Sequence, residues 1–367
     1  MKSLLKRSDE LIKPNSRILI IHLSAIGDVI HTLPAAHALR TSFPNSYLAW
    51  IVEDAGYNLI QGHPELDEVI LFPKKEIKKI FKEKGFFAAL KLILEFGRKI
   101  RSYHFDVVID FHNMFKSSII DLFSGAKVKT GFGPGREGNR FFLTHVFEHP
   151  SQPKHFVDIE LELTRLLGAD IHDVQFVFPD YNKETLKIDK FLAENSVNNP
   201  FFCVAPSTSP SWTNKLWTFE GMAKLIDRLS DYGSVLIIGT ESDRKIINET
   251  KKLLTTKPID TTGLFNLREL AVLLRKASLF VGGDTGPMHL AAAMGTHTIA
   301  WMGPTKPVRN GPYPGRGVSV SLGLACQYCH KRQCPNNDNA CLQNLPFDMV
   351  WSTTLPYLNE LKSEAKL

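Results

Sequence analysis

The sequence predicts an α/β protein of two doubly wound parallel-sheet domains that face a central cleft. Strand and helix patterns alternate along all 367 residues. Apolar runs such as 18–21 and 235–238 are continuous, which is typical of parallel strands covered on both faces. Repeated βα units of this kind build doubly wound sheets, and the pattern breaks once, near 178–199.

The chain is long enough for two separate cores. We expect an N-terminal extension over 1–15, a first domain over 16–180, a second over 181–350 and a C-terminal helix or tail over 351–367. First-domain strands are expected at 17–23, 47–52, 68–72, 107–111 and 129–131, with helices at 33–42 and 86–103. Second-domain strands are expected at 201–205, 234–239, 259–261, 279–282 and 297–301, with helices starting near Thr218, Ser242, Asn266 and Pro287.

Composition indicates an ordinary globular protein, with 43% hydrophobic and 22% charged residues. No apolar run approaches the roughly 20 residues that cross a bilayer. The first ten residues lack the apolar segment of a secretory signal. We therefore expect a cytoplasmic protein.

Basic residues are concentrated in one segment. Residues 74–101 hold ten Lys or Arg and three Glu, whereas the whole chain carries a net charge of +6. One interpretation is a solvated helix face. The other is a landing surface for acidic lipid head groups, since apolar residues such as Phe81, Phe86 and Phe87 are interleaved with the lysines. Nucleic acid is not expected as a partner, because no nucleic-acid-binding module accompanies the charge.

Four of the five cysteines lie close together, at Cys326, Cys329, Cys334 and Cys341. Their spacing is typical of ligands to a structural zinc ion or an iron–sulfur centre. Reduced thiols, or disulfides formed on isolation, are the alternatives, and the cytosol disfavours disulfides. If a metal is bound, we expect a structural role and not a catalytic one.

The segment from Asp284 to Pro287 is the start of a predicted helix. Thr285 or Asp284 can cap that helix, and a proline is well placed in its first turn. Free N–H groups at a helix start bind phosphate, Gly286 lets a diphosphate approach the backbone, and His289 lies in the same turn. The alternative is a plain N-cap beside a histidine that packs.

Two further strand ends carry polar residues. Three hydroxyl residues precede Lys215 after one strand, namely Ser207, Thr208 and Ser209. Hydroxyls with a lysine suit a diphosphate, and the alternative is that Lys215 is simple surface charge. Glu241 and Asp243 follow the next strand. A carboxylate there can bind ribose hydroxyls or cap the following helix.

Asp28 follows Gly27 at the end of the first strand. An acidic residue at a helix start is favourable to the helix dipole, but opposite a diphosphate it can act as a general base. The glycine-rich segment 131–136 lacks the GxGxxG spacing, so a nicotinamide dehydrogenase is not expected.

Three motifs in register resemble the ADP-heptose:lipopolysaccharide heptosyltransferases, glycosyltransferase family nine. They are the segments 24–34, 107–117 and 284–289, the last followed by Gly303-Pro-Thr305, and the resemblance runs from Arg17 to Pro307. It implies a GT-B fold of two Rossmann-like domains. It implies an ADP-L-glycero-D-manno-heptose donor, a Kdo or heptose acceptor on lipid A, and inversion at the anomeric carbon. With such an acceptor, the basic segment 74–101 is expected to meet the phosphorylated, membrane-embedded substrate, so we expect peripheral attachment to the anionic cytoplasmic face of the inner membrane.

The resemblance also implies roles for individual residues. Asp28 would be the general base, and Phe265 would line the adenine. The ribose acid would be Glu241 or Asp243. The diphosphate would meet Ser207, Thr208, Lys215, Asp284, Thr285, Gly286 and His289. Arg136 would face the acceptor or the donor. Acceptor contacts are also expected from Lys116 and from two residues of the basic segment, Lys74 and Lys75.

The chemistry is expected to need no cofactor. Helix N–H groups, hydroxyls and Lys215 can stabilise the leaving ADP without Mg²⁺, and no DxD motif is placed at the diphosphate. The alternatives are another GT-B sugar-nucleotide enzyme, with a different donor or an epimerase activity, and a catalytically silent binding protein.

Overall fold

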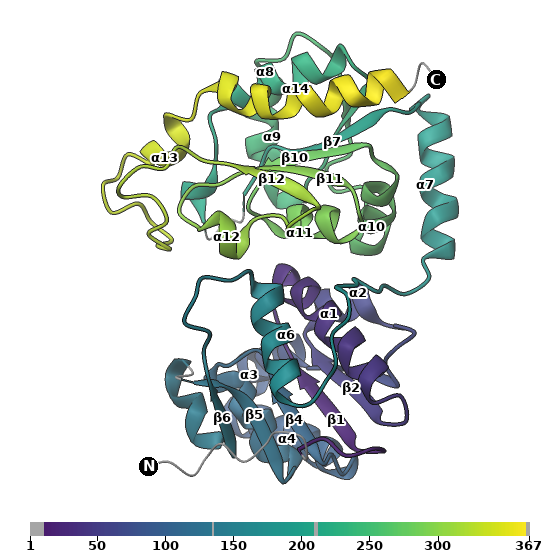
Figure 1. Cartoon of the computed structure of the whole chain (residues 1–367), viewed down its shortest axis with the longest axis vertical. Helices are drawn as coiled ribbons and strands as arrows, with labels where there is room; N and C mark the ends of the chain where they lie inside the picture. Colours follow the sequence, from purple (N-terminus) through teal and green to yellow (C-terminus); the bar gives the residue numbers. More distant parts are fainter. Residues whose placement is uncertain (1–10, 134–135, 209–211, 365–367) are drawn as a thin grey trace. The chain divides into compact units, whose positions relative to one another are not determined.

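The computed structural model describes residues 11–133, 136–208 and 212–364, without the side chains of Arg136, Thr213 and Glu364. The chain divides into two compact units, Met1–Asp180 and Tyr181–Leu367. Figure 1 shows the elements of each unit. Among the residues described, no helix combines the length and apolar character needed to cross a bilayer.

The first unit is built on a parallel sheet with strand order β3-β2-β1-β4-β5-β6. The strands are β1 Arg17–Ile21, β2 Tyr47–Val52, β3 Glu68–Leu71, β4 Val107–Asp110, β5 Val128–Gly133 and β6 His145–Glu148. All four residues of the apolar run 18–21 are fully buried, as the continuous pattern predicts. The edge strand β6 was not predicted, because its residues alternate between half-buried and exposed.

Helices cover both faces of this sheet. They are α1 Ile26–Ser42, α2 Asp54–Ile60, α3 Lys74–Lys84, α4 Phe86–Ser102, α5 Phe115–Ser124 and α6 Phe156–Leu166, with a 3-10 segment η2 at Arg136–Phe142. Helices α1 and α6 pack together on one face, and α4 packs with α5 on the other (Figure 1). Helix α1 begins well before the expected residue 33, so Pro34 lies inside it.

The second unit repeats this architecture with strand order β12-β11-β10-β7-β8-β9. Its strands are β7 Phe201–Ala205, β8 Ser234–Ile237, β9 Ile259–Asp260, β10 Leu279–Gly283, β11 His297–Trp301 and β12 Gly317–Val320. The doubly wound parallel-sheet prediction is therefore confirmed in both units. The edge strand β12 was not predicted, because it is short and partly exposed.

The helices of the second unit also lie on both faces of its sheet. They are α7 Asn182–Glu194, α8 Phe219–Ser230, α9 Arg244–Lys251, α10 Leu267–Lys276, α11 Gly286–Ala293, α12 Pro307–Asn310, α13 Ala340–Gln343 and α14 Phe347–Glu364, with 3-10 turns η3 Thr213–Lys215 and η4 Glu241–Asp243. Helix α14 packs on α8, β11 and β12, and the buried Trp217 and Trp301 rings meet in the core between them. Residue 350, where a domain end was expected, therefore lies inside a packed helix.

Candidate functional site

The predicted site residues of the second unit follow the carboxyl ends of its strands. Ser207 and Thr208 follow β7, Glu241 follows β8, and Asp284 follows β10. Because β10, β7 and β8 are parallel neighbours, these ends meet at one edge of the sheet. This edge is where doubly wound sheets bind ligands.

Asp284 is the centre of a buried polar cluster at this edge. Its Oδ2 accepts hydrogen bonds from Lys215 Nζ at 2.7 Å and Thr305 Oγ1 at 2.6 Å. His289 Nε2 lies 3.4 Å from its Oδ1. Burial opposes the charged form, but the hydrogen bond from His289 and the charge of Lys215 hold the pKa of Asp284 well below its usual range. Asp284 is thus a carboxylate that positions a lysine and a histidine.

The start of α11 lies directly beside this cluster. Thr285 is the N-cap residue, but among the described groups its hydroxyl makes no capping hydrogen bond and instead donates to Gly283 O at 3.3 Å. The expectation that Thr285 or Asp284 caps the helix is therefore wrong, because the Asp284 carboxylate turns toward Lys215 and Thr305. Pro287 has no N–H, and the N–H groups of Met288 and His289 donate to Thr285 O at 3.1 and 3.4 Å. The N–H of Gly286, which no side-chain cap covers, is therefore the group that the first turn offers to an anion.

Lys215 is held from two sides. Its Nζ lies 4.5 Å from the centre of the Trp212 ring, in addition to its ion pair with Asp284. Thr208 is buried and donates to Trp212 O at 3.1 Å, so its hydroxyl holds the loop that carries Lys215. Ser207 is half-buried beside it, and Ser209 lies outside the described residues.

Glu241 and Asp243 have different environments. Asp243 is buried, and its Oδ2 accepts from the backbone N and hydroxyl of Thr240 at 2.7 and 2.6 Å, so it caps its own turn. Glu241 is exposed and forms a two-point ion pair with Arg244, with both contacts at 2.7 Å. Phe265 is half-buried and packs edge-on against Phe191, with ring centres 5.0 Å apart.

In the first unit, Asp28 lies in the first turn of α1, the helix that follows β1. It is half-buried, and its Oδ2 accepts from the backbone N of Ala25 at 2.8 Å. Beneath it, Thr32 donates to Asp28 O at 2.9 Å and contacts His22 Nδ1 at 2.7 Å. Burial alone would lower the pKa of His22, but Glu160, whose Oε1 lies 3.3 Å from His22 Nδ1, raises it.

Two of the predicted acceptor lysines meet on a residue that the sequence reasoning missed. Glu53 directly follows β2 and accepts from Lys74 Nζ at 2.6 Å and Lys116 Nζ at 3.0 Å. Lys116 also donates to Ser24 Oγ at 2.9 Å, in the turn before Asp28. The signal for Glu53 was its place after a strand, the same signal that identified Asp28.

The third acceptor lysine contacts a different carboxylate. Lys75 is mostly exposed, and its Nζ lies 3.4 Å from Asp54. The side chain of Arg136 lies outside the described residues. In the motif at 107–117, the buried carboxylate of Asp110 accepts hydrogen bonds from Ser117 Oγ at 2.7 Å and Asn139 Nδ2 at 2.6 Å.

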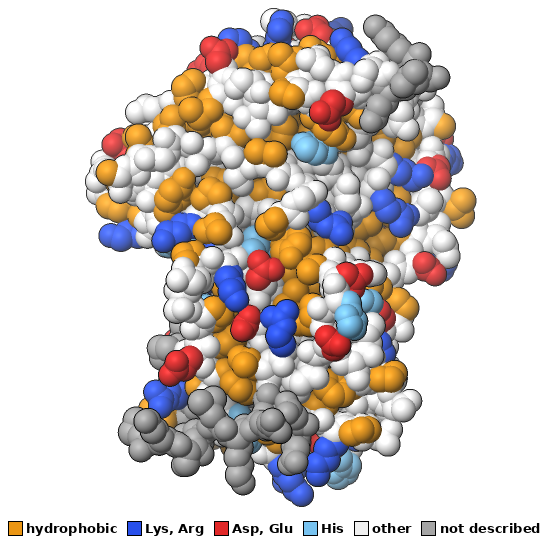
Figure 2. Space-filling view, in the orientation of Figure 1, with side chains coloured by type: hydrophobic (Ala, Val, Ile, Leu, Met, Phe, Trp, Pro, Cys, Tyr) orange, Lys and Arg blue, Asp and Glu red, His pale blue; other side chains and the backbone are white. Residues whose placement is uncertain are grey.

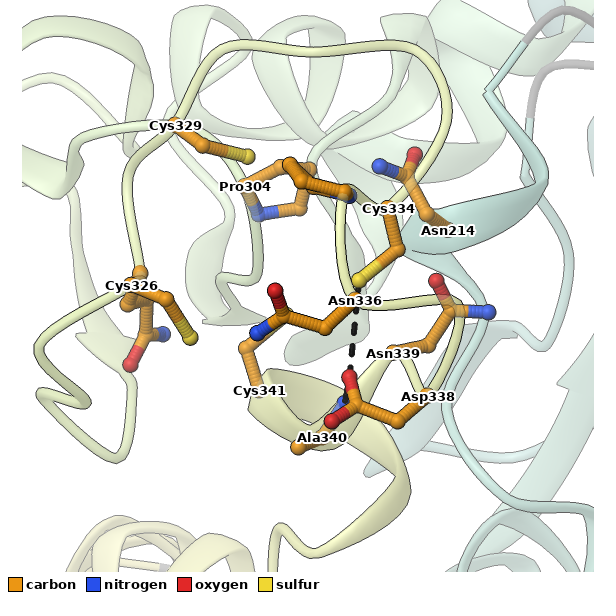
Figure 3. A pocket seen from close by; sticks show the side chains of 12 residues that line it. Asn214, Pro304, Cys326, Cys329, Cys334, Asn336, Asp338, Asn339, Ala340 and Cys341 are labelled. Carbon is orange, nitrogen blue, oxygen red and sulfur yellow. Dashed lines mark hydrogen bonds between the residues drawn. The ribbon is translucent and has the colours of Figure 1, made fainter.

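The four clustered cysteines line one pocket with Asn214 and Pro304 (Figure 3). All four are free thiols, and Cys334 lies 3.4 Å from Asp338 Oδ1. Burial, followed by the charges of the three other cysteines, raises the pKa of Cys341 to about 11. Across the described part of the chain, no three His, Cys, Asp or Glu side chains converge as a set that could hold a metal ion. The structural metal therefore stays a prediction.

The cysteine segment is attached to the Asp284 cluster by hydrogen bonds. Asn214 Nδ2, next to Lys215 in the chain, donates to Lys331 O at 2.8 Å. His330 N donates to Pro304 O at 2.8 Å, next to Thr305. Burial and then the charges of Arg309, Lys306 and Lys215 lower the pKa of His330. The cysteine segment thus braces the two loops that supply partners to Asp284.

The fold defines the class of protein first. The chain is similar to a family 9 glycosyltransferase from Veillonella parvula, with a TM-score of 0.79 and 21% identity over 96% of this chain and 100% of that one. It is also similar to the E. coli heptosyltransferase WaaC with ADP, with a TM-score of 0.68 and 22% identity over 93% and 99% of the two chains. These are GT-B glycosyltransferase folds, as expected.

The family follows from the sequence match. The profile of glycosyltransferase family 9 (heptosyltransferase) matches residues 93–339, well over half of the chain, so the protein belongs to this family and is a glycosyltransferase. The lipopolysaccharide core heptosyltransferase OpsX of Haemophilus influenzae is 25% identical over 308 residues, which are 83% of each chain.

Proposed function

We propose that the protein transfers a heptose from an ADP-heptose donor to a Kdo or heptose of the lipopolysaccharide inner core, with inversion at the anomeric carbon. The observation that carries the proposal is the Lys215–Asp284–His289 cluster beside the uncapped start of α11. The names of the similar proteins, a lipopolysaccharide core heptosyltransferase and a heptosyltransferase with ADP, support the same donor and acceptor classes.

The second unit supplies the donor site in this proposal. The Gly286 N–H at the start of α11, together with Ser207 and Lys215, binds the diphosphate, while Asp284 holds Lys215 and His289 in position. Phe265 lines the adenine. Glu241 binds the ribose, since Asp243 already caps its own turn. The leaving ADP gains negative charge as the sugar bond breaks, and Lys215 and the Gly286 N–H stabilise that charge without a metal ion.

The first unit supplies the binding site for the acceptor and the general base. Asp28 takes the proton from the attacking acceptor hydroxyl, which then bonds to the anomeric carbon as the bond to ADP breaks. Lys74 and Lys116, both held by Glu53, bind an anionic group of the inner core. Because that acceptor is carried on lipid A, the protein works at the cytoplasmic face of the inner membrane.

The direct test compares Asp28→Asn with the parent protein. The variant should lose transfer by at least about a hundredfold, the lower end of what a general base contributes, while ADP affinity in calorimetry stays unchanged. Asp348→Asn is the matched control, because Asp348 also lies in the first turn of a helix but is exposed on α14. Near-normal turnover of Asp28→Asn would refute the assignment of the base.

Two further measurements address the donor. Titration with ADP and UDP should show clear preference for ADP, and a preference for UDP would favour another GT-B sugar-nucleotide enzyme. Transfer should survive EDTA, because the proposed charge stabilisation comes from Lys215 and the Gly286 N–H. Loss of activity in EDTA that Mg²⁺ restores would contradict the metal-independent step.

A further inference from the structure

We propose that the hairpin of α3 and α4 is a docking surface for a bilayer rich in anionic lipid, with Phe81, Phe86 and Phe87 as its interfacial anchors. The inference deepens the proposed function, in which the acceptor is lipid-borne. It depends on features of the hairpin that the sugar-transfer site does not explain.

The aromatic side chains at the hairpin turn are unusually exposed. Phe81, Phe86 and Phe87 are 57%, 60% and 83% exposed, and all lie within seven residues around Gly85. The rings of Phe86 and Phe87 contact each other edge-on, with centres 5.7 Å apart. Neighbouring exposed apolar side chains of this size mark a contact surface, whereas isolated ones need no explanation.

Helix α3 has no role in the core of the first unit. None of its eleven described residues is buried, and it packs chiefly against α4. A helix with six lysines and two glutamates gains little stability from packing against neighbouring elements. Its composition of lysines around apolar residues is instead that of a helix lying in a membrane interface.

Charge complementarity identifies the occupant as an anionic bilayer. The segment 74–102 holds ten of the 44 basic residues and three of the 38 acidic ones, so the rest of the chain, with 34 basic and 35 acidic residues, is nearly neutral. Figure 2 shows basic and acidic side chains interspersed on the face drawn there. Clustered lysines are attracted to anionic head groups, and aromatic rings insert at the boundary with the acyl chains.

The hairpin is joined directly to the proposed acceptor site. Lys74, the first residue of α3, holds Glu53 together with Lys116. Eleven helical residues rise about 16 Å, so the aromatic turn lies about that far along the helix from Lys74. A bilayer bound at the turn would therefore lie within reach of the group that holds the acceptor.

Vesicle sedimentation of the full chain tests the proposal. The probes are phosphatidylethanolamine vesicles with and without phosphatidylglycerol, and they contain neither donor nor acceptor. The chain should bind the anionic vesicles, and binding should weaken as salt screens the charges. Replacing Phe81, Phe86 and Phe87 with Ser should lower binding at least about tenfold, since each buried ring contributes hydrophobic free energy. Replacing Lys78, Lys79 and Lys82 with Glu should abolish the preference for anionic lipid.

Matched controls lie on exposed sites of the second unit. Leu186→Ser with Leu253→Ser removes exposed apolar side chains, and replacing Lys183, Lys190 and Lys245 with Glu gives the same change in net charge. Both controls should bind vesicles like the parent. In Phe87→Trp, the new indole should be quenched by brominated lipid.

Three results would overturn the proposal: equal binding of parent and phenylalanine variant, no binding by the parent, or equal binding with and without phosphatidylglycerol. A fourth such result is a change in the oligomeric state of the protein, measured without vesicles, when the phenylalanines are replaced. That result would mean that the hairpin is a contact between copies of this chain. Since no sugar transfer is measured, failure here would leave the proposed function standing.

Discussion

Asp284→Asn is expected to destabilise the second unit strongly, because it removes one partner of a buried ion pair. The side chains of Lys215 and Asp284 are 12% and 6% exposed and lie 2.7 Å apart. Removing one partner of such a pair leaves the other charge buried and costs about 3–5 kcal/mol. At about 2–4 °C per kcal/mol for a domain of this size, the melting temperature should fall by about 6–20 °C.

The control for Asp284→Asn is an ion pair of equal length that is exposed. Lys252 and Glu249 are also 2.7 Å apart, but their side chains are 66% and 41% exposed. Glu249→Gln should therefore cost less than about 1 kcal/mol. Differential scanning calorimetry of both variants measures the contrast. A shift for Asp284→Asn no larger than that for Glu249→Gln would refute the argument that burial decides the effect.

The stabilising contribution of Asp284 should decrease at acidic pH. The folded-state pKa of Asp284 is lowered, so its contribution to stability is complete above the unfolded value of about 3.9 and is lost as pH falls toward the folded value. The difference in stability between the parent and Asp284→Asn should therefore narrow as the pH falls below about 4. A difference that stays constant from neutral to strongly acidic pH would contradict the lowered pKa.

The remaining predictions concern the acceptor lysines, the ribose and the cysteines. Glu53→Gln should raise the acceptor KM about tenfold and leave the donor KM unchanged, because Lys74 and Lys116 lose the carboxylate that orders them; steady-state kinetics with each substrate varied checks this, and an unchanged acceptor KM contradicts it. Glu241→Gln should weaken ADP binding about tenfold by calorimetry without lowering the melting temperature, because Glu241 is exposed; equal affinity would remove its ribose role. Replacing all four cysteines in 326–341 with Ser should leave transfer activity unchanged, and elemental analysis should show that the variant has lost the predicted structural metal. A parent protein without bound metal would contradict the prediction of that metal.

The sequence predicted the features that depend on local patterns. Continuous apolar runs identified the central strands, because a strand covered on both faces needs apolar residues at every position. The short polar segments after these strands identified Asp28, Lys215 and Asp284. The edge strands β6 and β12 were missed, because an exposed edge relaxes the requirement for apolar residues. The helix α3 has no buried residues, which agrees with the solvated helix face that was one interpretation of the basic segment, but the bounds of the helix were not predicted.

The contacts within the sites depend on the order of the strands, which local patterns do not contain. Glu53 meets Lys74 and Lys116 because β2 lies beside β3 on one side and is separated from β4 by β1 alone on the other. Asp284 was one of two residues, with Thr285, that could cap α11, which is a common role of an acidic residue at a helix start. The pairing of β10 with β7 and β11 instead brings the loops of Lys215 and Thr305 to it, and both side chains donate to its carboxylate.

A carboxylate therefore orders the lysines in both units, Glu53 in the first and Asp284 in the second. A lysine ammonium carries three N–H donors, so an ion pair with one carboxylate oxygen leaves donors for an anionic ligand. Such a pair partly neutralises the site, which weakens the attraction for anions in general. It also fixes the direction of the remaining donors, so less side-chain entropy is lost when the ligand binds. Selectivity at both sites should then arise from the position of the donors more than from net positive charge.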